Sequence, residues 1–195
     1  LLPYLEAIVM RSIPNMLVVS PADATEAALA TEAILNYNGP AYLRLSRSSS
    51  PIIFDENYKF EIGKGTYLAK GSDVTIVATG LMVERAIAAV ELLKAEGINA
   101  SLINMATIKP IDKDILLDAA KTTGCIVTAE EHSVIGGLGS AVAEALAETY
   151  PVPVLRVGVE DTFGKSGPAL ELLEIFGLNA ANIVEKAKKA IALKK

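Results

Sequence analysis

Apolar and polar positions along the chain follow two periodicities, one typical of strands and one typical of helices. Short β-branched runs recur, and most are followed by a longer segment whose apolar positions repeat every three or four residues. The predicted strands are 16–19, 41–45, 74–78, 100–104, 126–128 and 154–157, and the predicted helices are 21–37, 82–95, 112–121, 141–148 and 180–193. Strands that alternate with helices favour a parallel sheet with helices on both faces. We therefore predict an α/β fold with three layers, helix, sheet and helix.

The start of the first long helix carries a capping signal. Ser20 is the expected N-cap, Pro21 the first helical residue and Asp23 the acidic member of a capping box. The helix is expected to stop at Asn38-Gly39-Pro40, which is a typical end signal.

The pattern divides the chain into two unequal parts. Residues 46–57 show little periodicity and contain three consecutive serines, which predicts a linker. We expect an incomplete α/β piece at 1–50, a linker at 51–62 and a complete α/β domain at 63–195. The chain begins at Leu1, within a pattern typical of the middle of a helix, so we expect it to be a fragment of a longer protein.

Composition narrows the class of partner. The formal net charge is −5 and there is no run of Lys and Arg, which argues against nucleic acid as a partner. Cys125 is the single cysteine and lies in a predicted strand, so no internal disulfide can form and a reducing, cytoplasmic location is expected. Apolar runs are too short to span a membrane, and no secretory signal is present.

A glycine-rich loop, Gly136-Gly137-Leu138-Gly139, stands between a predicted strand and a helix. Such a loop often binds an anion through the free N–H groups of the first helical turn. It matches only part of the dinucleotide fingerprint, because Val142 stands where a small residue is needed and the loop after the strand is long. Glu160 lies at a distance downstream that would suit a ribose ligand, but these departures argue against a nucleotide. We expect the glycines to let the loop turn and the helix pack closely on the sheet.

His132 and its two acidic neighbours are the other candidate group. No second histidine or usable cysteine completes a zinc site, so we expect His132 to pack the loop after its strand. Glu130 and Glu131 point in opposite directions if the strand continues, and they then cannot act as a pair of carboxylates at one site. We expect them to be structural or interface residues.

Four segments in order resemble the C-terminal half of transketolase, a thiamine-diphosphate-dependent enzyme. The resemblance covers nearly the whole chain, and four segments with sensible spacing are far more specific than any one of them. The segments are Ser20-Pro21-Ala22-Asp23, Leu45-Ser46-Arg47, Thr107-Ile108-Lys109-Pro110 (an expected turn), and Glu130-Glu131-His132 followed by Gly136 to Val142.

The resemblance implies that residues 1–50 end the family's pyrimidine-binding domain and that 63–195 are its C-terminal domain. The intact enzyme would transfer a two-carbon ketol unit between sugar phosphates, as in the pentose phosphate pathway, with thiamine diphosphate and Mg²⁺ bound between two subunits. The expected partners are an N-terminal transketolase section and a second copy in a homodimer. The family's catalytic glutamate, aromatic ring contacts and histidines would precede Leu1, and no Gly-Asp-Gly metal motif is present. We therefore expect no catalytic, metal-binding or cofactor-binding residue here, and an inactive fragment.

Arg47 is the expected substrate ligand, because the family places a phosphate-binding arginine at this strand end. A guanidinium is permanently charged and can grip phosphate with two parallel hydrogen bonds. Ser46 and Ser48 are weaker candidates as additional donors. Arg44 belongs to the same segment but is expected on the other face of the sheet.

Two other functions fit part of the pattern. One is a related thiamine enzyme, either 1-deoxyxylulose-5-phosphate synthase or the β subunit of a 2-oxoacid dehydrogenase. Leu45-Ser46-Arg47-Ser48 favours transketolase, since the synthase typically carries Arg-Tyr-Pro-Arg-Gly there. The other is a non-catalytic dimerisation or binding module with the same fold. A Gly-Glu-Asp-Gly segment followed by His-Gln upstream of Leu1 would decide for transketolase.

Overall fold

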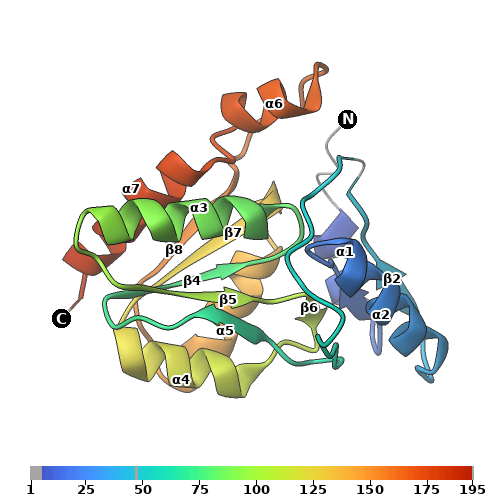
Figure 1. Ribbon diagram of the computed structural model, residues 1–195. Helices are drawn as coiled ribbons and strands as arrows, with labels where there is room; N and C mark the ends of the chain where they lie inside the picture. Colours follow the sequence, from blue (N-terminus) through green and yellow to red (C-terminus); the bar gives the residue numbers. More distant parts are fainter. Residues whose placement is uncertain (1–5, 47, 195) are drawn as a thin grey trace.

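The larger part of the molecule is built on a five-stranded sheet. The computed structural model describes residues 6–46 and 48–194, and Figure 1 shows their arrangement. Four strands run parallel, and β3 runs antiparallel at one edge. In spatial order the strands are β3 (Thr66–Ala69), β5 (Ala100–Asn104), β4 (Val74–Ala78), β7 (Ile126–Ser133) and β8 (Val154–Val159).

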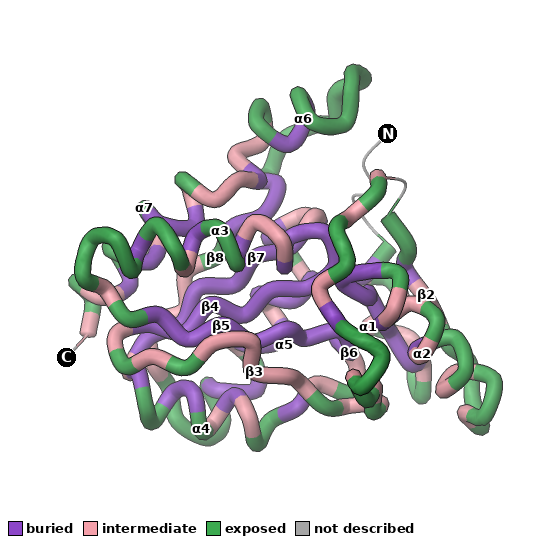
Figure 2. Tube along the Cα trace, viewed as in Figure 1, coloured by how far each residue is buried: buried purple, intermediate pink, exposed green. Residues whose placement is uncertain are grey.

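Helices cover both faces of this sheet (Figure 1). Helices α3 (Met82–Ala95) and α7 (Ala180–Ala192) pack on one face, and α4 (Lys113–Thr123) and α5 (Leu138–Ala147) pack on the other. Neighbouring residues of one strand face opposite ways, so Ile76 contributes to the core beneath α3 and Val77 to the core beneath α4 and α5. The central strands β4 and β5 are buried along their whole length (Figure 2), which confirms the predicted three-layer α/β fold.

A second, three-stranded sheet joins the two parts of the chain. Its order is β2 (Ala41–Leu43), β1 (Leu17–Val19) and β6 (Thr107–Lys109), accompanied by α1 (Glu6–Ser12) and α2 (Ala24–Leu35). The early strands β1 and β2 are parallel, whereas β6 comes from the later part of the chain and runs antiparallel to β1. Residues 107–109 are thus a strand, and the turn predicted there is wrong. A run of three residues is too short to predict a strand by itself, and its partner strand β1 lies in a distant part of the sequence.

Helix α2 begins three residues later than predicted. Asp23 is the N-cap, and its carboxylate accepts the N–H of Glu26 at 2.8 Å. Glu26 in turn accepts the N–H of Ala22 at 2.7 Å. Asp23 and Glu26 thus form a capping box that begins three residues later than the one predicted at Ser20 and Asp23. Ser20 lies three residues before this N-cap, and its N–H donates to Ala106 O, which continues the strand pairing of β1.

Three elements depart further from the predicted pattern. Strand β3 and the short helix α6 (Ala169–Ile175) were not predicted, and β7 continues five residues beyond Thr128. The extension of β7 places Glu130, Glu131 and His132 on the strand itself. Among the described residues, no helix is both long and apolar enough to cross a membrane.

Candidate functional site

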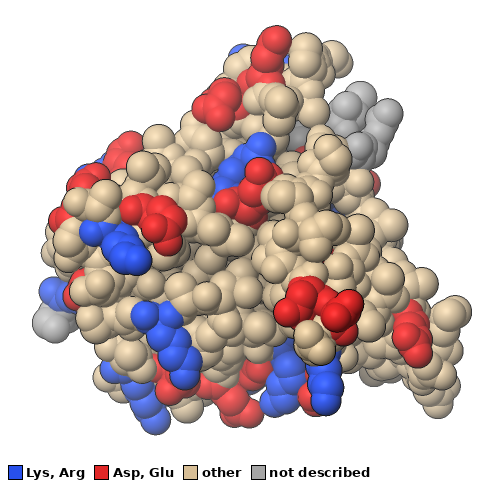
Figure 3. Space-filling view, viewed as in Figure 1, with Lys and Arg blue, Asp and Glu red and all other residues tan. Residues whose placement is uncertain are grey.

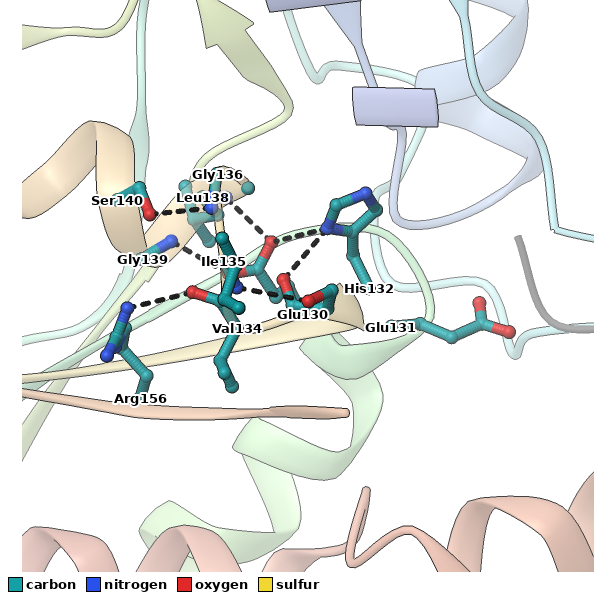
Figure 4. A network of polar contacts seen from close by, with 12 residues as sticks. Glu130, Glu131, His132, Val134, Ile135, Gly136, Leu138, Gly139, Ser140 and Arg156 are labelled. Atoms are coloured by element: carbon teal, nitrogen blue, oxygen red, sulfur yellow. Dashed lines mark hydrogen bonds and ion pairs between the residues drawn. The ribbon is translucent and has the colours of Figure 1, made fainter. Parts of the chain in front are cut away.

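The glycine-rich loop is closed by a glutamate of the same chain. Glu130 extends from β7 to the start of α5, where one carboxylate oxygen accepts the N–H of Leu138 at 2.6 Å and the other accepts the N–H of Gly139 at 2.8 Å (Figure 4). These N–H groups belong to the first turn of the helix, where an external anion would otherwise bind. The Glu130 carboxylate therefore occupies the anion position of this loop.

The glycines are required by close packing around this carboxylate. A Cβ at Gly137 would overlap the Glu130 carboxylate, and a Cβ at Gly136 would overlap the Ile8 side chain of α1. A Cβ at Gly139 would lie 2.7 Å from both Arg156 and Thr128. The prediction that the glycines allow a turn and close packing agrees with this geometry.

Burial governs the protonation of Glu130. Removal from water raises its pKa to about 7, although the two helix N–H groups and the nearby Arg11 and Arg44 all favour the charged carboxylate. His132 lies next to it, with Nδ1 3.9 Å from the Glu130 carboxylate. The same burial lowers the pKa of His132, which favours a neutral ring.

His132 is a buried residue of β7, and its ring lies against the glycine-rich loop, where a Cβ at Gly137 would be 2.9 Å from Nδ1. This contact agrees with the expectation that His132 packs the loop after its strand. Its Nδ1 lies 2.9 Å from the carbonyl oxygen of Ser133, so a neutral ring donates from Nδ1 and leaves Nε2 as an acceptor. That Nε2 is buried and has no hydrogen-bond partner among the described residues. Figure 4 shows the ring and the side chain of Glu131 extending in different directions from β7, as strand alternation requires.

Glu131 forms the link between the two sheets. Arg44, directly after β2, donates from Nη2 to the backbone oxygen of Glu131 at 2.8 Å and lies 3.6 Å from its carboxylate. Both side chains are almost fully buried, and burial raises the pKa of Glu131 while Arg44 opposes the shift. Sequence reasoning left Arg44 without a role, because the residue that pairs with it lies 87 positions along the chain.

These contacts bring the carboxyl ends of strands from both sheets to one place. Gly80, just beyond β4, donates to Ser20 O just beyond β1, and Arg44 beyond β2 reaches β7. Ligand sites of α/β proteins lie at the carboxyl ends of parallel strands. The segment that follows Arg44 therefore starts at the edge where a substrate site is expected.

Helix α1 is fastened to the glycine-rich loop from the other side. Arg11 donates to Gly136 O at 2.7 Å and pairs with Glu144 of α5 at 2.7 Å. Lys109 of β6 donates to the backbone oxygens of Arg11 and Ile13 at the end of α1. The loop thus holds both α5 and α1, so it joins the early part of the chain to the later part.

Arg47, the predicted phosphate ligand, lies outside the described residues. Of its neighbours, Ser46 is exposed and its hydroxyl accepts the N–H of Ser48 at 3.1 Å. Ser46 is thus accessible at the carboxyl edge, and its predicted role as a weaker phosphate ligand stays a prediction.

The described residues do not fit thiamine diphosphate at the glycine-rich loop. The N–H groups that would bind a diphosphate are occupied by Glu130, whose carboxylate would repel phosphate oxygens. Residues 6–46 and 48–194 also contain no group of three or more His, Cys, Asp or Glu side chains that could hold a metal ion.

Comparison with known proteins settles the family. Residues 63–183 match the family described as transketolase, C-terminal domain. This chain belongs to the transketolase family. It is 49% identical to the 6-deoxy-6-sulfo-D-fructose transketolase subunit SqwH of Clostridium sp. (strain MSTE9), over 92% of this chain and 56% of that protein. It is 46% identical to a putative transketolase C-terminal section of Methanocaldococcus jannaschii, over 93% of this chain and 58% of that protein.

Solved structures extend the likeness to nearly the whole chain. A structure described as "Split gene transketolase, inactive beta4 tetramer" is 49% identical, with a TM-score of 0.94, and the match covers 98% of this chain and 62% of that one. This transketolase-family chain therefore spans a little over half the length of these relatives. The related synthases that the sequence left open are also similar, with 39% identity to 1-deoxy-D-xylulose-5-phosphate synthase of Heliobacterium modesticaldum over 92% of this chain and 28% of that protein.

Proposed function

We propose that this chain is the C-terminal section of a transketolase that works together with a separate N-terminal section. The observation that carries the proposal is the match to the split-gene structure, which extends through the early part of the chain as well as the family domain. Two relatives described as a subunit or section are 46–49% identical and a third is 37% identical, against 35% for human transketolase, which the chain covers over only 29% of its length. The two higher identities support two sections over one fused chain.

In the assembled enzyme, a two-carbon ketol unit would pass between sugar phosphates. Residues outside this chain would bind thiamine diphosphate and Mg²⁺, since the described residues here do not fit them. This section would supply Arg47, with Ser46 as an additional donor, to bind the substrate phosphate at the carboxyl edge. A guanidinium in this place neutralises a phosphate without taking part in bond breaking.

The remaining parts of the proposal concern organisation. Residues 1–50 would end the pyrimidine-binding domain, 51–62 would be the linker and 63–195 the C-terminal domain. A homodimer of the complete enzyme and a cytoplasmic location complete the proposal. The chain alone would be inactive, which is consistent with the related split-gene transketolase structure, an inactive β4 tetramer.

The test is reconstitution of activity. A complete C-terminal subunit that contains this chain is mixed with the N-terminal transketolase section of the same organism, thiamine diphosphate and Mg²⁺, and transfer from xylulose 5-phosphate to ribose 5-phosphate is followed. We expect transfer only when both sections are present. Condensation of pyruvate with glyceraldehyde 3-phosphate, without ketol transfer, would support the synthase instead.

A further inference from the structure

Arg44 is held in place by both its backbone and its side chain. It directly follows β2, and its N–H donates to Val19 O of β1 at 2.8 Å. Its guanidinium donates to Glu131 O of β7 at 2.8 Å. A Cβ at Gly80 would lie 4.0 Å from Nη1 of Arg44, so the guanidinium also lies beside the end of β4. One side chain thus ties the end of β2 to two strands of the larger sheet.

The segment directly after Arg44 is held less firmly. Leu45 is 59% exposed, and the hydroxyl of the exposed Ser46 accepts an N–H only two residues along the chain. Among the described residues, the next long-range hydrogen bond is that of Ser50, whose hydroxyl donates to Ala22 O at 3.0 Å. The segment that carries the proposed phosphate ligand therefore takes its starting position from Arg44.

The contact of Arg44 with β7 is buried and is directed at the backbone. The side chains of Arg44 and Glu131 are 8% and 10% exposed, and Nη2 lies 3.6 Å from the carboxylate, beyond ordinary hydrogen-bond distance. Arg44 Nε and the Glu131 oxygen Oε2 are buried without a hydrogen-bond partner among the described residues. The directional bond of Arg44 is therefore the one to the main-chain oxygen, which does not depend on the side chain at position 131.

A phosphate bound here needs a precisely placed ligand, because the molecule offers no broad attraction to an anion. The formal net charge is −5, and basic and acidic side chains are interspersed on the face shown in Figure 3. A contact between a guanidinium and a phosphate through two parallel hydrogen bonds depends on the orientation of both groups. The position of the segment after β2 therefore matters as much as the charge that it carries.

We propose that Arg44 is a positioning residue for the substrate-phosphate site, which sets the place of Arg47 by holding the end of β2 against β7. The inference rests on the proposed function, which takes Arg47 as the phosphate ligand. Arg44 itself does not bind the phosphate, since its guanidinium is buried and donates to Glu131 O. The two arginines of this segment thus have different tasks, one in holding the strand end and one in binding substrate.

The kinetic test uses a complete C-terminal subunit that contains this chain, assembled with the N-terminal section. Arg44→Met combined with Glu131→Gln removes the hydrogen bond without leaving a buried charge unpaired, so it avoids the main destabilising effect of the single variant. It should raise the KM for xylulose 5-phosphate about ten-fold, because misplacement of a binding group by a fraction of an ångström is costly. Hydroxypyruvate, which has no phosphate, should show nearly unchanged kinetics. Glu131→Gln alone should have little effect, because it keeps the main-chain oxygen.

Two further variants identify the route of the effect. If Arg44 acts through Arg47, the double variant should raise the KM no further when Arg47→Ala is already present. Arg11→Met is the matched control. The Arg11 side chain, 16% exposed, also binds a main-chain oxygen, Gly136 O at 2.7 Å, and a carboxylate, but no proposed substrate ligand follows it. This variant should leave the KM for both donors unchanged.

Hydrogen exchange gives a readout that does not need activity. The N–H at position 44, which donates to Val19 O, should exchange faster in the double variant than in the wild type. Its protection should be unchanged in Arg11→Met. Unchanged protection in the double variant would show that the backbone alone fixes the strand end, and would overturn the inference whatever the kinetics.

The kinetic outcomes separate the inference from the proposed function. If Arg47→Ala discriminates between the two donors and the Arg44 double variant does not, only the positioning role is overturned. A further rise in KM when the double variant is combined with Arg47→Ala would also overturn it, because Arg44 would then act by another route. If Arg47→Ala affects both donors equally, the phosphate role of Arg47 in the proposed function is overturned, and the positioning role with it.

Discussion

Glu130 fills the position at the start of α5 that an external anion would otherwise occupy. Its carboxylate accepts hydrogen bonds from two helix N–H groups, and its negative charge lies at the positive end of the helix dipole, where it is stabilising. The cost is the removal of the carboxylate from water, which raises its pKa to about 7. The residue therefore holds the loop in place and titrates near neutral pH.

Replacement of Glu130 by Gln should change how stability depends on pH. Between about pH 4.3 and pH 7 the Glu130 carboxyl is protonated in the folded protein but ionised in the unfolded chain. This carboxyl therefore makes the folded protein less stable as the pH rises through that window. The unfolding free energy of the wild type relative to Glu130→Gln should be larger at pH 5.5 than at pH 8, by about 1–2 kcal/mol. Urea unfolding at both pH values measures this. His132, whose pKa is lowered, makes the protein more stable as the pH rises, but the wild type and Glu130→Gln both contain it, so the comparison between them removes its effect. A difference that stays constant with pH would contradict the expectation.

Arg47→Ala in the complete enzyme should weaken the binding of phosphorylated sugars. Loss of a charged hydrogen-bond partner worth ~1.5–3 kcal/mol corresponds to a KM roughly ten- to a hundred-fold higher. Hydroxypyruvate has no phosphate, so its kinetics should change little, and Arg47→Lys should restore only part of the effect. Steady-state kinetics with both donors give the comparison. Equal losses for the two donors, at unchanged stability, would show that Arg47 does not bind the phosphate.

For single residues, the sequence predicts which side chains of a strand point in opposite directions but not which residues they contact. The opposite directions of Glu130 and Glu131 follow from the strand period alone. Their partners, the start of α5 and Arg44, depend on the packing of distant segments. No local pattern indicates such contacts.

Among the elements, the glycine-rich loop is the one most constrained by its neighbours. It turns between β7 and α5 while α1 lies against it, so three glycines meet side chains from three directions. The strand before the loop and the helix after it were predicted, with boundaries too short by a few residues. The sequence did not predict strand β6, and it placed the start of α2 too early. Both errors have one cause: β6 pairs with β1, and Ser20 continues β1 through its hydrogen bond to Ala106 O.

Gly137→Ala should destabilise the protein, since the added methyl group overlaps the Glu130 carboxylate. The expected loss in unfolding free energy is about 1–3 kcal/mol, typical of overpacking in a closed site. Gly167→Ala is the control, because its Cβ would meet Leu172 only at ordinary contact distance, 3.5 Å. Thermal unfolding of both variants gives the comparison. Equal melting temperatures would show that the loop can relax around the methyl group.

The whole molecule consists of a complete three-layer unit and a smaller sheet that depends on it. Strand β6 completes the smaller sheet, and Arg11 and Lys109 fasten α1 to the loop and to β6. The alternating pattern was sufficient to predict the fold class. It could not predict that the two parts share a sheet, because the pairing of β1 with β6 joins residues far apart in sequence.

Residues 63–195 should therefore fold without the first part, but with β6 unpaired. In the full chain β6 pairs with β1 through Val18 and Val19, and in the isolated piece this partner is gone. Hydrogen exchange should show the five-stranded sheet protected in both proteins and residues 107–109 exchanging faster in the isolated piece. A piece without protected amides would show that the first part is needed for folding.

The central claim is that this chain supplies part of a transketolase site but not the part that binds the cofactor. Calorimetric titration with thiamine diphosphate and Mg²⁺ tests it, on the chain alone and on a complete C-terminal subunit mixed with the N-terminal section. We expect no measurable binding to the chain alone, because Glu130 occupies the helix N–H groups, and clear binding to the two assembled sections. Micromolar binding to the chain alone would contradict the account.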